Sequence, residues 1–241
     1  MKIPSSALRT KILLLILAVS VLLIPFRHKI RSLIYRNNYT VTERLAQYEE
    51  RVKERLGPSF QRVNADYPPP WMGIVAIKDS KKLELWVESI HGNRVLLREY
   101  PILAASGKPG PKLREGDYQV PEGIYKVESL NPNSLYHLSL RVNYPNDFDR
   151  QKAKEEGRAN LGGDIMIHGS NLSIGCLAVG DDTIEDIFVL AAKNWPRHIP
   201  IVISPVDFRK GDTVGDEKKG ILWRQELYQD IQYILEKYTQ K

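Results

Sequence analysis

The spacing of hydrophobic residues changes along the chain, and each spacing predicts a different element. Residues 12–26 form an apolar run without a charge, preceded by Arg9 and Lys11. Residues 42–56 carry apolar side chains at helical spacing, and Gly57-Pro58 then favours the end of a helix. The N-terminal part is therefore expected to hold an apolar helix followed by an amphipathic one.

From Gly73 onward the apolar residues tend to alternate with polar ones, which is typical of strands with one buried face. Strands are predicted at 74–77, 83–88, 94–103, 134–142, 165–167 and 200–204, and a hairpin joins 118–120 to 123–127. Helical spacing returns after Asp181 or Asp182, either of which can cap a helix to about Lys193, and again over 221–238. Residues 151–158 are expected to form an exposed short helix or lid. Together these patterns predict a mainly β fold with flanking helices, in the α+β class.

The only cysteine of the chain follows a predicted strand and a tight loop. The strand Ile165–Ile167 ends at His168, small and polar residues follow, and Cys176 comes next. A thiol and an imidazole that face each other across one turn form a nucleophile and its base. The backbone N–H groups near Gly175 can then hold the oxyanion that develops. The alternative reading is that Cys176 is a small buried hydrophobic residue.

This arrangement resembles the L,D-transpeptidase catalytic domain, the YkuD family of cell-wall enzymes. The family signature, H-G followed by S-x-G-C, stands here as His168-Gly169 and Ser173-Ile174-Gly175-Cys176. Residues 116–125, 131–134 and 143–146 also resemble family segments, the last two those of a Gram-negative branch that includes a peptidoglycan–lipoprotein amidase. The resemblance covers residues 72–205 and implies a β-sandwich or partial barrel.

The resemblance implies that Cys176 is the nucleophile and His168 the proton acceptor and donor. A backbone carbonyl at Gly169 is expected to orient His168, since no Asp or Asn has an assignable place, and Gly175 contributes to the oxyanion hole. The predicted substrate-binding residues are Arg141, Tyr144, Asn146, Ser170 and Ser173. Arg141 can bind a carboxylate with two hydrogen bonds, or it can simply face solvent. Tyr144 and Asn146 are included because the resemblance places them near the active site.

The expected reaction is L,D-transpeptidation of peptidoglycan stem peptides through a cysteine thioester. Hydrolysis at the same Cys–His site, including cleavage of lipoprotein–peptidoglycan links, is one alternative, and a non-catalytic wall-binding scaffold is another. An outer-membrane lipoprotein is thus a second candidate partner. No cofactor is expected, and the five histidines lack the paired spacing of a metal site.

Charge and compartment complete the prediction. The chain has 241 residues and a net charge of +6, which suits an anionic wall or lipid headgroups, and no nucleic-acid-binding motif is present. The run at 12–26 is expected to anchor the protein in the inner membrane with its catalytic domain in the periplasm; cleavage and secretion to the periplasm is the alternative. The predicted organisation is an anchor (1–30), a stalk helix and proline-rich linker (31–71), a catalytic domain (72–205) and a C-terminal loop and helix (206–241).

Overall fold

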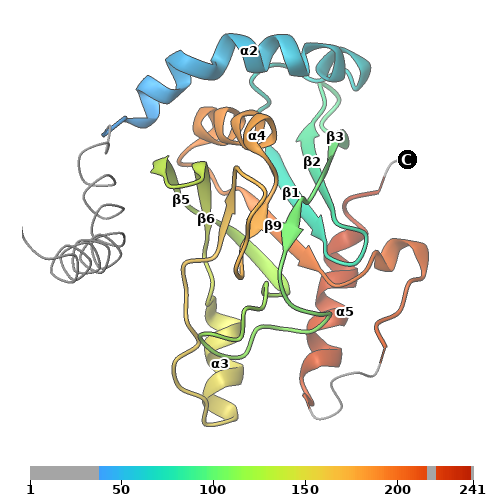
Figure 1. Ribbon diagram of the computed structural model, residues 1–241. Coiled ribbons are helices and arrows are strands. Elements are labelled where there is room, and N and C mark those ends of the chain that lie inside the picture. The colour runs from blue at the N-terminus through green and yellow to red at the C-terminus, as the bar shows by residue number, and fades with distance from the viewer. Residues whose placement is uncertain (1–37, 216–220, 240–241) are drawn as a thin grey trace, which may run out of the picture. The chain divides into compact units, whose positions relative to one another are not determined.

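The computed structural model describes residues 38–215 and 221–239 (Figure 1). Residues Tyr39–Lys241 form one compact unit, separate from Met1–Asn38. Within the described residues, no helix combines the length and the apolar character that crossing a bilayer requires. The apolar run at 12–26 lies outside the described residues, so the membrane anchor stays a prediction.

A single mixed sheet of nine strands forms the centre of the unit, in the order β3-β2-β1-β9-β5-β6-β7-β8-β4. Its strands are β1 (Met72–Ile77), β2 (Lys82–Glu88), β3 (Arg94–Pro101), β4 (Ala104–Ala105), β5 (Gly123–Ser134), β6 (His137–Val142), β7 (Met166–His168), β8 (Leu177–Ala178) and β9 (Pro200–Ser204). Its helices are α2 (Val41–Arg62), α3 (Asp147–Glu155), α4 (Asp181–Asn194) and α5 (Arg224–Leu235), with a short 3-10 helix at Phe208–Lys210. The predicted α+β class is confirmed.

Helices cover both faces of the sheet where β1, β2 and β9 meet. Ile74 and Ile201 belong to the core beneath α2 and α4, whereas Val75 and Val202 pack in a second core against α5. Figure 1 shows α2 and α4 on one side of the sheet and α5 on the other. Side chains that alternate along each strand therefore pack into two different cores, and these strands are buried on both faces.

Helix α2 is longer than its sequence predicts. A capping box between Thr40 and Glu43 starts it, and the helix continues past Gly57-Pro58 to Arg62. Its buried face repeats at helical spacing and is made by Tyr48, Val52, Leu56 and Phe60. Burial of Phe60, beyond the proline, explains why the expected stop at Gly57-Pro58 is wrong: packing outweighs the one hydrogen bond that Pro58 removes.

Two expectations about the strands are also corrected. β2 was expected to have one exposed face, but Glu84 and Trp86 are buried there, and Arg209 forms an ion pair with Glu84 at 2.7 Å. Residues 118–120 form no strand. Instead β5 runs for 12 residues, pairing with β9 through Gly123–Lys126 and with β6 through its later part. The predicted hairpin fails because β9 supplies the partner strand from a distant part of the sequence.

A buried carboxylate joins the C-terminal helix to the loop that precedes β5. Glu122 is 1% exposed and accepts hydrogen bonds from the Lys78 ammonium (2.8 Å), the Gly110 N–H (2.6 Å) and the Tyr228 hydroxyl of α5 (2.8 Å). Through the Gly110 N–H, Glu122 therefore holds this loop by its backbone. Three elements therefore converge on one side chain.

Candidate active site

His168 ends β7, and Cys176 immediately precedes β8, the parallel strand that pairs with β7. β7 and β8 pair with Ile167 opposite Leu177 and His168 opposite Ala178, so Cys176 lies level with Met166. Ile167 and Leu177 both point into the core, which turns the residues before and after them to the opposite face. From a rise of about 3.3 Å per residue and a strand spacing of about 4.8 Å, the Cα atoms of Cys176 and His168 lie about 8 Å apart. This separation is within reach of two side chains that converge.

His168 is buried, and its backbone neighbour determines its tautomer. The side chain is 2% exposed, and Nδ1 lies 2.6 Å from the carbonyl oxygen of Gly169. Because a carbonyl oxygen only accepts, Nδ1 must donate, which leaves the lone pair on Nε2. Burial lowers the pKa of His168 below its usual value, against the smaller opposing effect of the Gly169 carbonyl. The imidazole is therefore neutral near pH 7 and able to accept a proton.

An aromatic ring lies against this imidazole. Tyr136, in the turn between β5 and β6, stacks on His168 with ring centroids 4.6 Å apart and an interplanar angle of 27°. The stacking and the Nδ1 hydrogen bond together restrict the imidazole to one plane. Alternation along 134–142 assigns Tyr136 no role at the site, because it puts Tyr136 on the same face as Leu138 and Leu140. The structure instead places its ring against the His168 imidazole, and His137, with φ of 75°, interrupts the alternation there.

The residue after His168 has to be glycine. A Cβ atom at Gly169 would lie 2.5 Å from Asp181 Oδ1 and 2.7 Å from the Tyr136 carbonyl oxygen. The same Asp181 carboxylate accepts the Ser170 N–H at 2.8 Å. The expected capping of α4 by an Asp side chain is therefore wrong: the N-cap is Gly180, and Asp181, at the first turn, instead ties the His-Gly segment to the helix.

The Cys176 thiol is partly exposed and donates to the Asp164 carbonyl oxygen at 3.5 Å. Burial raises the pKa of Cys176, while a hydrogen bond from the Met166 backbone lowers it by a smaller amount. Asp164 raises the same pKa through its negative charge, and Lys112 lowers it. The net effect is a pKa above the usual thiol value, so the Cys176 thiol is protonated at neutral pH.

Two hydroxyl groups organise the turn that carries Cys176. Ser173 Oγ accepts the Cys176 N–H at 3.0 Å and donates to the Cys176 carbonyl oxygen at 2.6 Å. Ser106 Oγ accepts the Gly175 N–H at 2.6 Å. Ser173 thus supports the turn, and the N–H groups of Gly175 and Cys176, where the oxyanion hole is expected, each have a hydroxyl partner. Nothing in the sequence linked Ser106 to this turn, because 69 residues separate it from Gly175.

The remaining predicted substrate-binding residues have different surroundings. Arg141 lies opposite Met166 in the β6–β7 pairing, on the face that carries Cys176, and its guanidinium bonds the carboxylates of Glu128 and Asp164. Tyr144 is 3% exposed and its hydroxyl donates to the Leu161 carbonyl oxygen at 3.2 Å. Asn146 is the N-cap of α3, and its amide donates to the Ile124 carbonyl oxygen at 3.0 Å. Tyr144 and Asn146 therefore hold the structure around the site, whereas Arg141 lies on its surface.

Comparisons with known proteins point to one family. The family model of the L,D-transpeptidase catalytic domain, YkuD, matches residues 73–214. The putative L,D-transpeptidase YafK of Escherichia coli K12 is 36% identical over 132 residues, covering 52% of this chain and 51% of YafK. YafK of E. coli O157:H7 gives the same values. The match therefore spans about half the length of these curated relatives.

Two solved structures show a partial likeness. The helical cell shape determining protein Pgp2 of Campylobacter jejuni is 23% identical with a TM-score of 0.46, over 57% of this chain and 48% of Pgp2. Bd1075 of Bdellovibrio bacteriovorus is 22% identical with a TM-score of 0.41, over 72% of this chain and 57% of Bd1075.

Proposed function

This chain belongs to the L,D-transpeptidase catalytic domain family, and we propose that it is a cysteine-dependent acyltransferase that acts on peptidoglycan stem peptides. The observation that carries the proposal is the pairing of β7 with β8, which puts a neutral, oriented imidazole and the single thiol of the chain on one face. A Cys–His pair of this kind supports acyl transfer through a thioester.

In the first step, His168 Nε2 takes the proton of the Cys176 thiol as the sulfur attacks a stem-peptide carbonyl. For this the thiol turns from the Asp164 carbonyl oxygen towards the imidazole, a rotation about one side-chain bond. The new C–S bond and the broken C–N bond balance when the imidazolium returns the proton to the departing amine. With D-Ala as the leaving residue, the acylated enzyme holds the stem at its third residue.

Gly175 remains our proposal for the oxyanion donor. Its N–H is aimed at Ser106 Oγ in the resting structure. A hydroxyl can rotate, so an oxyanion that carries full negative charge can displace it or share the N–H. The Gly175 backbone has φ of 89°, a left-handed conformation that glycine adopts without strain, and its missing side chain leaves room for the carbonyl group.

The acceptor decides which product forms. An amine yields a new cross-link or an attached protein, and water yields hydrolysis of the same thioester. Cleavage of a lipoprotein–peptidoglycan link is the second candidate, carried by the resemblance of residues 131–134 and 143–146 to a branch that includes such an amidase. Both reactions require the domain to be in the periplasm, and we propose that residues 12–26 anchor it to the inner membrane.

The experiment is treatment of purified sacculi with the full-length protein, followed by mass analysis of the muropeptides. New dimers joined through third residues support transpeptidation, and release of a lipoprotein-derived peptide supports the amidase. Cys176→Ala should abolish either product. If Cys176→Ala remains as active as the parent, the proposed chemistry is wrong; if the parent makes no product and its folded thiol does not react, the non-catalytic wall-binding scaffold is favoured.

A further inference from the structure

A hollow of about 520 Å³ lies beside the turn that carries Cys176. It is lined by Leu113, Arg114, Asp117, Gln119, Arg158 and Ala159. The backbone oxygen of Gln119 lies 3.9 Å from where a Cβ atom of Gly175 would be, so one wall of the hollow adjoins the turn. The two loops that form the hollow are joined by a hydrogen bond from the Glu115 N–H to the Asn160 carbonyl oxygen at 2.9 Å.

One cation in the hollow is held in place. The Arg158 guanidinium donates through Nε to a Glu156 oxygen at 2.6 Å and through Nη1 to the Leu113 carbonyl oxygen at 2.9 Å. Glu156 also accepts the Trp223 indole N–H at 2.7 Å. Arg158 therefore presents a positive charge in a defined position.

The carboxylate in the hollow is already neutralised. Asp117 pairs with the buried Lys112 ammonium at 2.5 Å and accepts the backbone N–H groups of Leu113, Arg114 and Gln119. These donors keep the pKa of Asp117 below its usual value although burial opposes them. Its charge is thus balanced within the loop and does not cancel that of the arginines.

The second cation has no such partner. Arg114 is exposed at the hollow, and among residues 38–215 and 221–239 its guanidinium has no ion pair and no hydrogen bond. Its backbone is fixed by Asp117, whereas its five N–H donors are unused. A hollow that adjoins the turn before Cys176 therefore combines one fixed guanidinium with one that is available to a ligand.

We propose that this hollow is a carboxylate subsite for the donor stem peptide, with Arg114 as the main ligand and Arg158 as a second, fixed cation. The inference rests on the proposed function and adds the recognition of the substrate's charge. A guanidinium binds a carboxylate through two parallel hydrogen bonds, so it selects both the charge and the orientation of the peptide. The carboxylate belongs either to the C-terminal residue that leaves or to a side chain of the stem.

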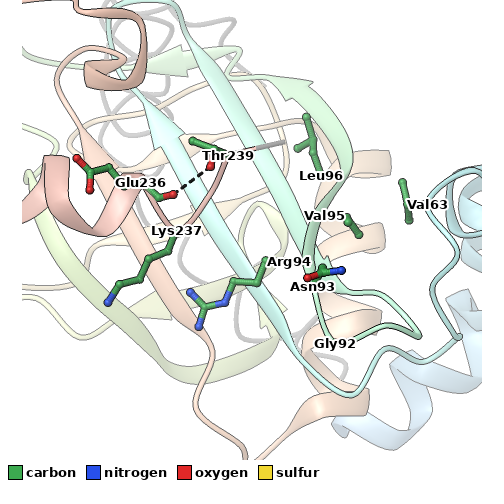
Figure 2. A pocket seen from close by; sticks show the side chains of 9 residues that line it. All are labelled: Val63, Gly92, Asn93, Arg94, Val95, Leu96, Glu236, Lys237 and Thr239. Carbon is green, nitrogen blue, oxygen red and sulfur yellow. Dashed lines mark hydrogen bonds between the residues drawn. The ribbon is translucent and has the colours of Figure 1, made fainter. Parts of the chain in front are cut away.

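A second hollow of about 610 Å³ provides a matched control (Figure 2). It also contains two cations, Arg94 and Lys237, but β3, where Arg94 lies, is at the opposite end of the sheet from β7 and β8. The Arg94 guanidinium is already stacked 4.4 Å from the Trp71 ring centroid and 5.6 Å from that of Tyr238. Loss of Arg94 removes a similar charge from a similar hollow far from the thiol.

The test measures peptide binding to the full-length Cys176→Ala protein by calorimetry, so that turnover does not interfere. The probes are a tetrapeptide stem with free carboxylates, the same peptide amidated at its C-terminus, and the peptide amidated at its other carboxylates. One of the two amidated peptides should bind about tenfold more weakly than the free peptide, which is the effect of a lost charge-assisted hydrogen bond. Adding Arg114→Gln should remove this difference, and adding Arg94→Gln should leave it unchanged.

Three outcomes would overturn the subsite. The three peptides could bind equally, none of them could bind, or the difference between them could persist in the Arg114→Gln variant. Turnover by the protein with Cys176 intact is measured separately. Product formation without a charge preference leaves the proposed function standing and removes the subsite. A charge preference that depends on Arg114, without product from the intact protein, keeps the subsite and removes the proposed catalysis.

Discussion

His168 Nδ1 donates a hydrogen bond to the carbonyl oxygen of the next residue, Gly169, at 2.6 Å. The imidazole is thus oriented by a neutral carbonyl and not by a carboxylate. A carboxylate would favour the imidazolium strongly, whereas a carbonyl does so weakly, and burial outweighs it. The result is an imidazole whose pKa lies below its usual value.

The pH dependence of kcat/KM should reflect this. The base form of His168 exists above its pKa and is lost as the pH falls through it. Since that pKa is lowered, the acidic limb of the profile should have its midpoint below the usual imidazole value of about 6.5. His168→Gln should abolish activity, and His91→Gln, which changes an exposed histidine, should leave the profile unchanged. A midpoint at or above 6.5 would contradict this account.

The reactivity of Cys176 should depend on Asp164. The Asp164 carboxylate raises the pKa of the thiol, so Asp164→Asn should lower it and speed alkylation by iodoacetamide at a fixed pH of about 8. In this variant the Arg141 guanidinium no longer pairs with a carboxylate at position 164, and its positive charge should also lower the pKa of the thiol. Because Cys176 is the only cysteine, alkylation reports on it alone. Asp147→Asn, in an exposed ion pair of α3, is the control; an unchanged or slower alkylation rate for Asp164→Asn would refute the prediction.

Gly169→Ala should destabilise the fold as well as the site. The new Cβ would press against Asp181 Oδ1 and the Tyr136 carbonyl oxygen, and overpacking of this kind costs about 1–3 kcal/mol. Gly57→Ala is the matched control, because no atom lies within 4 Å of its Cβ position. In a helix this second change should stabilise by up to about 1 kcal/mol. Urea unfolding measures both, and a neutral Gly169→Ala would show that the two contacts relax freely.

Arg55 is expected to be important for the docking of α2 onto α4. Its guanidinium lies 2.7 Å from Asp186 Oδ1 and 3.2 Å from Glu185 Oε2, two carboxylates that are almost fully buried. Arg55→Ala leaves them without this partner, and the free energy of unfolding should fall by about 3 kcal/mol. Arg150→Ala breaks an exposed pair and should cost less than about 1 kcal/mol. Similar effects for the two variants would mean that the buried carboxylates find other donors.

The sequence predicted the elements whose signals are local. The strand before His168, the final strand at 200–204 and the helix after Asp181 all follow from apolar spacing. The long β5 and the two-residue β8 were not predicted, because their partner strands are distant in sequence or too short to show alternation. The same limit applies to the site. The pairing of strands in the sheet brings three further residues to the site, because Ser106 follows β4 and Tyr136 and Asp164 come shortly before β6 and β7. Their spacing along the chain does not predict this arrangement.

Residues far from the thiol also determine its surroundings. Glu122 accepts hydrogen bonds from the Tyr228 hydroxyl of α5 and from the Gly110 N–H of the loop that begins near Ser106. Deleting α5 would leave a buried carboxylate with one donor fewer and uncover Trp86 and Val202. A C-terminal truncation should therefore impair the geometry around Gly175, although it removes neither Cys176 nor His168. Helix α5 stabilises the loops around the site from a distance, so it is an unsuitable place to shorten the protein.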